Sequence, residues 1–150
     1  MALAQRLEQD LKSALRAGDA IRVSTIRLAR AAIHNEEIER GRQLSDDEIR
    51  VVLSKEAKRR REAIEMFEKG RRDDLVAKES LELAILTEYL PAGLAPEELR
   101  KIVAEGIAQA RATARKDTGK VMALVMPRIA GRADGQTVNQ IVQEMLPEKA

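Results

Sequence analysis

Asp117-Thr-Gly-Lys-Val-Met-Ala-Leu-Val-Met-Pro-Arg-Ile-Ala-Gly-Arg-Ala-Asp-Gly-Gln-Thr-Val-Asn139 is the stretch on which both the fold and the predicted function depend. Two short apolar segments, at 121–126 and 138–145, flank a connection that contains glycines and a proline. Proline lacks the backbone N–H that a helix needs, so we expect the first short helix to stop before Pro127. Asp134 can accept a free backbone N–H and cap the second. The pattern therefore predicts two short helices joined by a tight connection.

The same stretch lies in the one window of the chain with a strong charge imbalance. Residues 111–132, here called the basic segment, contain six Lys/Arg and one acid. The cations are Arg111, Arg115, Lys116, Lys120, Arg128 and Arg132, and the acid is Asp117. Cations held at fixed places are typical of a surface that binds a polyanion such as nucleic acid. The alternative is structural, because cations near the C-terminal end of a helix stabilise its dipole without any partner.

The composition predicts an all-α fold. Hydrophobic residues make up 44% of the chain and charged residues 35%, with one Phe, one Tyr and no Trp. This is the composition of amphipathic helices. We expect helices at about 2–17, 20–40, from the Ser45 capping box to Gly70, 73–90, from Pro96 onward, 119–126, and from Asp134 to Pro147. Leu3, Leu7, Leu11 and Leu15 should form one buried face, and Ile21, Val23, Ile26, Ala29, Ile33 and Ile38 another.

A change of composition predicts two domains. The segment Pro91-Ala-Gly-Leu-Ala-Pro96 contains two prolines and a glycine within six residues, which is typical of a linker. We therefore expect an N-terminal four-helix domain at 1–90, a linker at 91–96 and a small C-terminal three-helix domain at 97–150. Counted from the sequence, residues 1–90 hold 18 Lys/Arg and 18 Asp/Glu, whereas residues 91–150 hold 9 and 7. The net charge of +2 thus belongs to the second part.

Several classes of chemistry are disfavoured by the residues present. The chain has no Cys and a single His, His34, so thiolate chemistry and multi-histidine metal cages are excluded. Gly119-Lys120 is not a phosphate-binding P-loop, because no glycine stands five residues earlier and Val121 follows the lysine. We expect no catalytic residues, no metal and no cofactor. No apolar run approaches the length of a membrane span, so we also expect a soluble cytoplasmic protein without a membrane partner.

Several ordered motifs carry a family resemblance. They are Lys58-Arg-Arg-Arg-Glu-Ala-Ile-Glu-Met-Phe67, Gly70-Arg-Arg-Asp-Asp-Leu75, Glu88-Tyr-Leu-Pro91, Gly119-Lys-Val-Met122, Met126-Pro-Arg128, Gly131-Arg-Ala-Asp-Gly135 and Val138-Asn139. Together they resemble the GatB/YqeY family along the whole chain. The last third is similar to the tail domain of the GatB component of the tRNA-dependent Asp/Glu amidotransferase. The resemblance implies a helical N-terminal domain and a small tail, which in the amidotransferase engages the tRNA body.

The candidate site follows from the basic segment and from this resemblance. Lys116, Lys120, Arg128 and Arg132 are the candidate phosphate contacts, and Gln136 and Asn139 are possible polar contacts. By the resemblance, Gly119, Gly131, Asp134 and Gly135 occupy turn positions. The two aromatic residues, Phe67 and Tyr89, lie outside this segment, so recognition of a folded RNA by shape and phosphate is favoured over base stacking. The Lys58–Arg61 run is either an auxiliary phosphate-binding ridge or a solvated face paired with nearby acids.

Three hypotheses about function remain open at this point. The first is a non-catalytic protein of translation that binds tRNA or another structured RNA. The second is a protein-interaction module that docks on an enzyme of tRNA aminoacylation or amidation. The third, which only the family resemblance suggests, is an auxiliary of a carbon–nitrogen ligase with glutamine as amido-N-donor.

Overall fold

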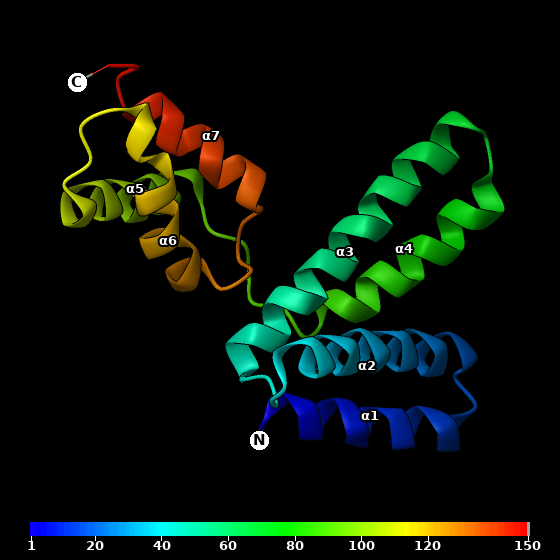
Figure 1. Ribbon diagram of the computed structural model, residues 1–150. Helices are drawn as coiled ribbons and strands as arrows, with labels where there is room; N and C mark the ends of the chain where they lie inside the picture. Colours follow the sequence, from blue (N-terminus) through cyan, green and yellow to red (C-terminus); the bar gives the residue numbers. More distant parts are fainter. Residues whose placement is uncertain (150) are drawn as a thin grey trace. The chain divides into compact units, whose positions relative to one another are not determined.

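The computed structural model describes residues 1–149 and shows an all-α protein, as predicted; no strand occurs among these residues. The chain divides into two compact units, an N-terminal unit of Met1–Pro91 and a C-terminal unit that begins at Ala92 (Figure 1). The N-terminal unit holds α1 (Leu3–Ala17), α2 (Ala20–Arg40), α3 (Asp46–Lys69) and α4 (Asp73–Thr87). The C-terminal unit holds α5 (Pro96–Ala110), the 3-10 helix η1 (Arg115–Asp117), α6 (Thr118–Ile129) and α7 (Gly135–Met145).

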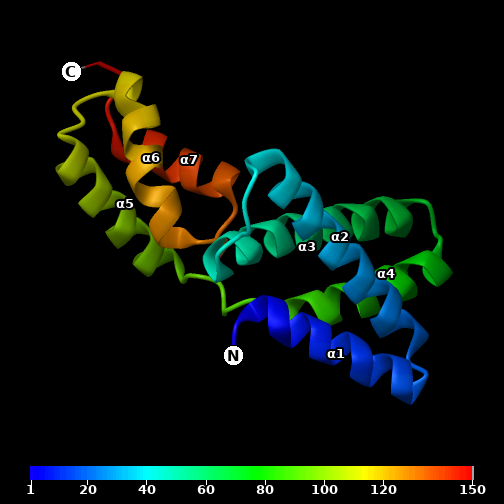
Figure 2. The ribbon, with the colours of Figure 1, turned by 60° about the horizontal axis from the view of Figure 1, so that its bottom comes forward.

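The α1–α2 hairpin of the N-terminal unit is specified by its two connecting residues (Figure 2). Gly18 adopts a left-handed conformation, with φ of 69°, which a residue without Cβ adopts at little cost. The carboxylate of Asp19 then accepts the backbone N–H of Arg22 at 3.1 Å and caps α2. This helix break was predicted from these same two residues and is confirmed.

The α3–α4 hairpin begins with the predicted capping box. The Ser45 hydroxyl accepts the backbone N–H of Glu48 at 3.2 Å, and the Glu48 carboxylate accepts that of Ser45 at 3.0 Å. At the other end, α4 stops at Thr87, three residues before the expected Leu90. The chain tightens there into bonds between residues three apart, and the turn buries the ring of Tyr89.

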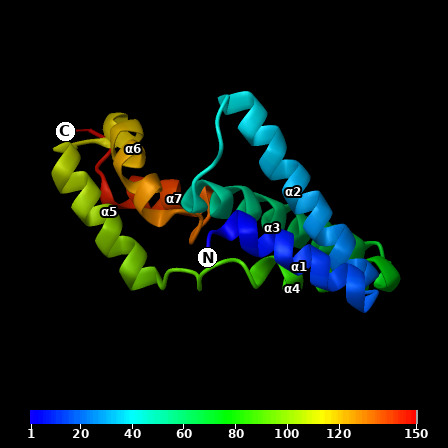
Figure 3. The ribbon, with the colours of Figure 1, turned by 90° about the horizontal axis from the view of Figure 1, so that it is seen from below.

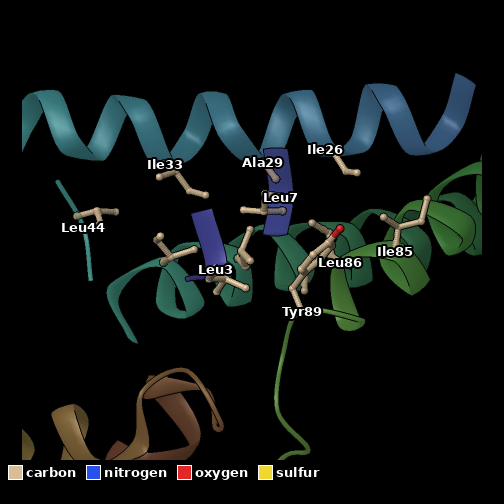
Figure 4. Packing of buried hydrophobic residues seen from close by; sticks show 12 residues of the cluster. Leu3, Leu7, Ile26, Ala29, Ile33, Leu44, Ile85, Leu86 and Tyr89 are labelled. Carbon is tan, nitrogen blue, oxygen red and sulfur yellow. The ribbon is translucent and has the colours of Figure 1, made fainter. Parts of the chain in front are cut away.

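The core of the N-terminal unit lies on one side of α2 (Figure 4). Ile26, Ala29 and Ile33 point from α2 toward side chains of α1, α3 and α4. The expected burial of Leu15 and Ile38 is wrong, since these residues are 50% and 66% exposed, and Ile21 is also exposed. A four-residue repeat turns by about 40° per step on a helix, so Leu15 lies about 120° away from Leu3. Ala14 takes the buried position instead.

The C-terminal unit has its own apolar core. Its fully buried residues come from α5, α6 and α7, and include Val103, Val121, Val125, Ile129, Val138 and Val142. Helices α5 and α6 pack closely at Gly106, where an added Cβ would stand 2.4 Å from a methyl of Val125. A glycine is therefore needed at this crossing for space.

Helix α6 differs from the sequence-based expectation, because it passes through Pro127 and ends at Ile129 rather than at Met126. A proline removes a single helical hydrogen bond, and Pro127 lies in the last turn on the exposed side. Continuing the helix buries Ile129 completely. Burial of such a side chain contributes about 1.5–3 kcal/mol, which offsets much of the cost of about 3 kcal/mol for a proline within a helix.

Candidate nucleic-acid interface

The predicted contact residues lie along α6 and its flanking segments. Lys116 is in η1, Lys120 and Arg128 are on α6, Arg132 follows α6, and Gln136 and Asn139 are in the first turns of α7. On α6 itself, Lys120, Ala123, Pro127 and Arg128 are exposed and form what is here called the α6 stripe. Val121, Val125 and Ile129 are buried on the opposite side of the helix. Arg128 lies eight positions after Lys120, which corresponds to about 12 Å along the axis.

Arg128 forms an ion pair within the same unit. Its Nη2 lies 2.7 Å from Oε2 of Glu105 on α5, and both side chains remain nearly half exposed. An exposed pair of this kind contributes only about 0–1 kcal/mol. The Arg128 guanidinium can therefore be transferred to a phosphate at small cost.

Arg132 has a structural role beside any role in binding. Its Nε donates to the Ala92 carbonyl at 3.2 Å, and its own carbonyl accepts the N–H of Leu94 at 3.1 Å. These bonds fasten the start of the C-terminal unit to the α6–α7 connection. A variant of Arg132 would consequently change folding and binding together, so Arg128 is the better residue to test.

Lys120 lies close to the only acid of the basic segment. Its Nζ is 3.8 Å from Oδ1 of Asp117, and the Lys120 side chain is 73% exposed. The backbone N–H of Thr113 donates to the Asp117 carboxylate at 3.0 Å and holds its pKa below the usual value, and Lys120 and Lys116 add to this effect. Asp117 is thus an anion that shapes the loop before α6 and neutralises part of the charge there.

Arg115 is used to connect two elements of the unit. Its Nε donates to the Gln143 carbonyl at 3.0 Å, its Nη1 lies 3.1 Å from Glu148, and its backbone N–H donates to the Pro147 carbonyl at 2.8 Å. These contacts attach η1 to the end of α7. Arg115, one of the six cations of the basic segment, therefore stabilises the fold of the unit.

The two polar candidates on α7 differ in availability. Gln136 is exposed, and its backbone N–H donates to the cap Asp134 at 3.4 Å. The side-chain oxygen of Asn139 accepts from the Gln143 amide at 2.8 Å along the helix, and Asn139 is half-buried. Gln136 is therefore the better placed of the two for contact with a ligand.

The four turn residues occupy different kinds of position. Gly131 has a positive φ of 80°, which favours glycine, and follows Ala130, the C-cap of α6. Asp134 is the N-cap of α7 and Gly135 its first residue. Gly119 lies inside the first turn of α6, and a Cβ at that position would meet nothing within 4 Å in the described residues.

The Lys58–Arg61 run of α3 separates into residues with different surroundings. Arg59 is exposed and lies 3.3 Å from Glu56 one helical turn away. Arg60 is buried, and its Nε lies 3.3 Å from the buried carboxylate of Glu82 on α4. At least Arg60 is therefore withdrawn from any ligand-facing surface.

An open cleft of about 650 Å³ in the N-terminal unit was not predicted from the sequence. Arg6, Asp10, Arg22 and Glu88 line it and bind one another or their neighbours. Arg22 reaches Glu88 at 2.6 Å, which lowers the pKa of that carboxyl, and the Tyr89 hydroxyl donates to Asp10. These contacts hold the end of α4 against α1 and α2, so the cleft is primarily a structural junction.

Residues 1–149 offer neither a metal-binding cluster nor a membrane-spanning helix. No three His, Cys, Asp or Glu side chains among them are grouped in a way that could hold a metal ion. None of the described helices combines the length and the apolar character that crossing a membrane requires.

Comparison with known proteins gives a matching family and individual relatives. The family described as Yqey-like protein matches residues 4–146. The relatives include the protein named "Altered inheritance of mitochondria protein 41, mitochondrial" from Eremothecium gossypii, which is 42% identical over 87 residues, covering 57% of this chain and 48% of the relative. The protein of the same name from Lachancea thermotolerans is 39% identical over 85 residues, covering 56% and 46%. The matches thus span about half the length of these relatives.

The names of these relatives correct one prediction. We expected a cytoplasmic protein, but the matched proteins are named as mitochondrial, which contradicts that expectation. The expectation relied on the absence of a hydrophobic leader, and such an absence says nothing about an address of another kind. The family match covers nearly the whole chain, and on this ground the chain belongs to the Yqey-like family.

Proposed function

We propose that the C-terminal unit binds a structured RNA, with tRNA as the first candidate, through the phosphates of the RNA backbone. Lys116 and Lys120 contact phosphates at one end of α6, and Arg128 contacts them at the other. Arg132 and Gln136 extend the contact toward α7. The protein acts as a binding module, without a catalytic step of its own.

The observation that carries the proposal is the α6 stripe. It places Lys120 and Arg128 on one exposed side, about 12 Å apart along the helix. On the exposed side of α6 near these cations stand the compact side chains of Ala123 and Pro127. Leu124, one turn from each cation, is half-buried, so a nucleic-acid backbone can still approach the helix. Two separated cationic ends match a chain of phosphates better than they match a single small anion.

The aromatic residues favour recognition of a folded RNA. Tyr89 is buried in the N-terminal unit and Phe67 is half-buried on α3, so neither offers an open ring on which bases could stack. The resemblance of the last third to the GatB tail of the amidotransferase supports the same proposal. That tail engages the body of a tRNA, away from the reacting end.

The test is a binding titration between the 150-residue chain and a fluorescently labelled, unmodified tRNA transcript. Fluorescence anisotropy monitors the binding at several KCl concentrations. The parent should bind more weakly as salt rises, because bound phosphates release counterions. The variant Lys120→Ala with Arg128→Ala removes two phosphate contacts, so the slope of log affinity against log salt should fall by about 1.4–1.8.

A matched control removes the same charge elsewhere in the unit. Arg100 on α5 is also about half exposed and pairs at 2.9 Å with Glu144 on α7. Arg100→Ala with the exposed Lys101→Ala lowers the net charge equally but leaves the α6 stripe intact. This control should keep the salt slope of the parent. If the salt slope falls equally in both variants, binding depends only on the net charge of the protein and not on the α6 stripe.

A gain-of-function variant tests the role of the Arg128 pair. Glu105→Gln removes the carboxylate that holds Arg128, so tRNA affinity should rise, by up to about fivefold for a pair worth about 1 kcal/mol. A protein partner with an acidic surface is the competing proposal. Capture of such a partner after nuclease treatment, together with no tRNA binding, would favour it. Turnover of glutamine by the pure chain would contradict the non-catalytic part.

A further inference from the structure

The outward side of α2 carries a regular seam with no partner in the N-terminal unit. Ile21, Ser24, Leu28, Ala31, Asn35 and Ile38 alternate at spacings of three and four residues, and all six are exposed or only partly buried. This is the spacing with which one helix packs along another. We call these six residues the α2 seam.

The seam is open because the core lies on the other side of the same helix. Figures 3 and 4 show α1, α3 and α4 on the side of α2 that carries Ile26, Ala29 and Ile33. Leu28 is 55% exposed. It lies within α2 and not at an end of the helix, so fraying of a helix end does not account for its exposure. The small side chains of Ser24 and Ala31 lie between the larger ones, so another helix could approach closely.

Two arginines beside the seam have no ion-pair partner among residues 1–149. Arg27 and Arg30 are exposed, and no acid stands three or four residues from either of them. Their closest charged neighbours on the helix are each other, at a spacing where like charges repel. By contrast, Arg22 and Arg40 on the same helix each reach a carboxylate, Glu88 at 2.6 Å and Glu36 at 2.9 Å.

We propose that the α2 seam docks an amphipathic helix of a partner protein, with apolar residues that meet the seam and acidic residues that meet Arg27 and Arg30. Acidic flanks remove the repulsion between the two arginines, and apolar contacts cover Leu28 and Ile38. A second copy of this chain fits less well, because a two-fold interface repeats the same surface and would bring two more arginines to it. This proposal is independent of RNA binding by the C-terminal unit.

The experiment presents the full-length chain to a displayed library of helical peptides, randomised at the apolar seam positions and at the flanking positions. The expected selection has Leu or Ile at the seam and Asp or Glu at the flanks. The best peptide, synthesised and titrated into the chain labelled with nitrogen-15, should shift amide resonances of α2. Selection of no peptide, of basic flanks, or of binders that shift other helices would overturn the proposal.

Matched variants separate the two parts of the proposal. Leu28→Glu should weaken the peptide at least about tenfold, whereas Leu81→Glu, at a similarly exposed leucine of α4, should leave binding unchanged. Arg27→Glu with Arg30→Glu should lose the acidic peptide and bind a version with Lys at the flanks. Binding that survives these changes would contradict the assignment. So would a dimer in sedimentation equilibrium that Leu28→Glu dissociates, because the seam would then belong to a second copy.

Discussion

Gly106 provides the sharpest test of the packing that holds α5 and α6 together. The substitution Gly106→Ala adds a Cβ that would stand 2.4 Å from Cγ2 of Val125, well inside normal contact. Val125 is fully buried and β-branched, so it has little freedom to rotate away. Overpacking of this kind costs about 1–3 kcal/mol, while alanine gains about 1 kcal/mol over glycine inside a helix. The 2.4 Å contact favours the upper part of the overpacking range, so we expect a net loss of up to about 2 kcal/mol in the C-terminal unit.

Amide hydrogen exchange in the 150-residue chain measures this loss of stability separately for α5 and α6. Protection of the α5 and α6 amides should fall, while amides of α1–α4 serve as an internal reference. Val125→Ala should lose less in the Gly106→Ala background than alone, because it removes the clashing methyl groups. Gly119→Ala is the control, since a Cβ there meets nothing within 4 Å. Equal protection in parent and Gly106→Ala, or an equal loss in Gly119→Ala, would show that the crossing does not require glycine.

Two further predictions concern charged groups of the N-terminal unit. The Arg42 guanidinium lowers the pKa of Glu48 below its usual value of 4.5, so this carboxylate stabilises the fold above that pH and ceases to do so as the pH falls through its folded-state pKa. Thermal melts at decreasing pH should show this loss, and Glu48→Gln should melt lower near neutral pH with a flatter acid dependence. Glu82→Leu should destabilise the unit by up to about 3–5 kcal/mol in urea unfolding, because it leaves the buried Arg60 with only the more distant carboxylate of Glu56, 3.8 Å away. Arg60→Met in addition should recover most of that loss, and no recovery would contradict the buried pair.

Much of the fold could be predicted from short-range chemistry. The helix break at Gly18 and the capping box at Ser45 depend on residues that are close together in the sequence. Both could therefore be predicted from the sequence alone. The burial of individual apolar side chains was harder to predict. Leu15 continues the leucine repeat, yet the position of its neighbouring helices leaves it exposed. Pro127 is tolerated because Ile129 gains burial from packing that the local sequence does not show.

In the candidate site, too, long-range contacts could not be predicted from the sequence. The cations of the basic segment could be read from the sequence, whereas their partners could not. Arg128 pairs with a residue 23 positions away, and Arg132 binds a carbonyl 40 positions away. The nearer carboxylate partner of Arg60, Glu82, likewise lies on another helix. Long-range contacts of this kind decide which cations remain available to a ligand, and only the folded arrangement determines them.

The central claim is that α6 presents cations to the phosphates of a folded RNA. Its most direct test is the salt dependence of tRNA binding by the parent, by Lys120→Ala with Arg128→Ala, and by the charge-matched Arg100→Ala with Lys101→Ala. We expect a salt slope that falls by about 1.4–1.8 in the α6 variant and stays unchanged in the control. Identical slopes and affinities in all three chains would contradict the claim.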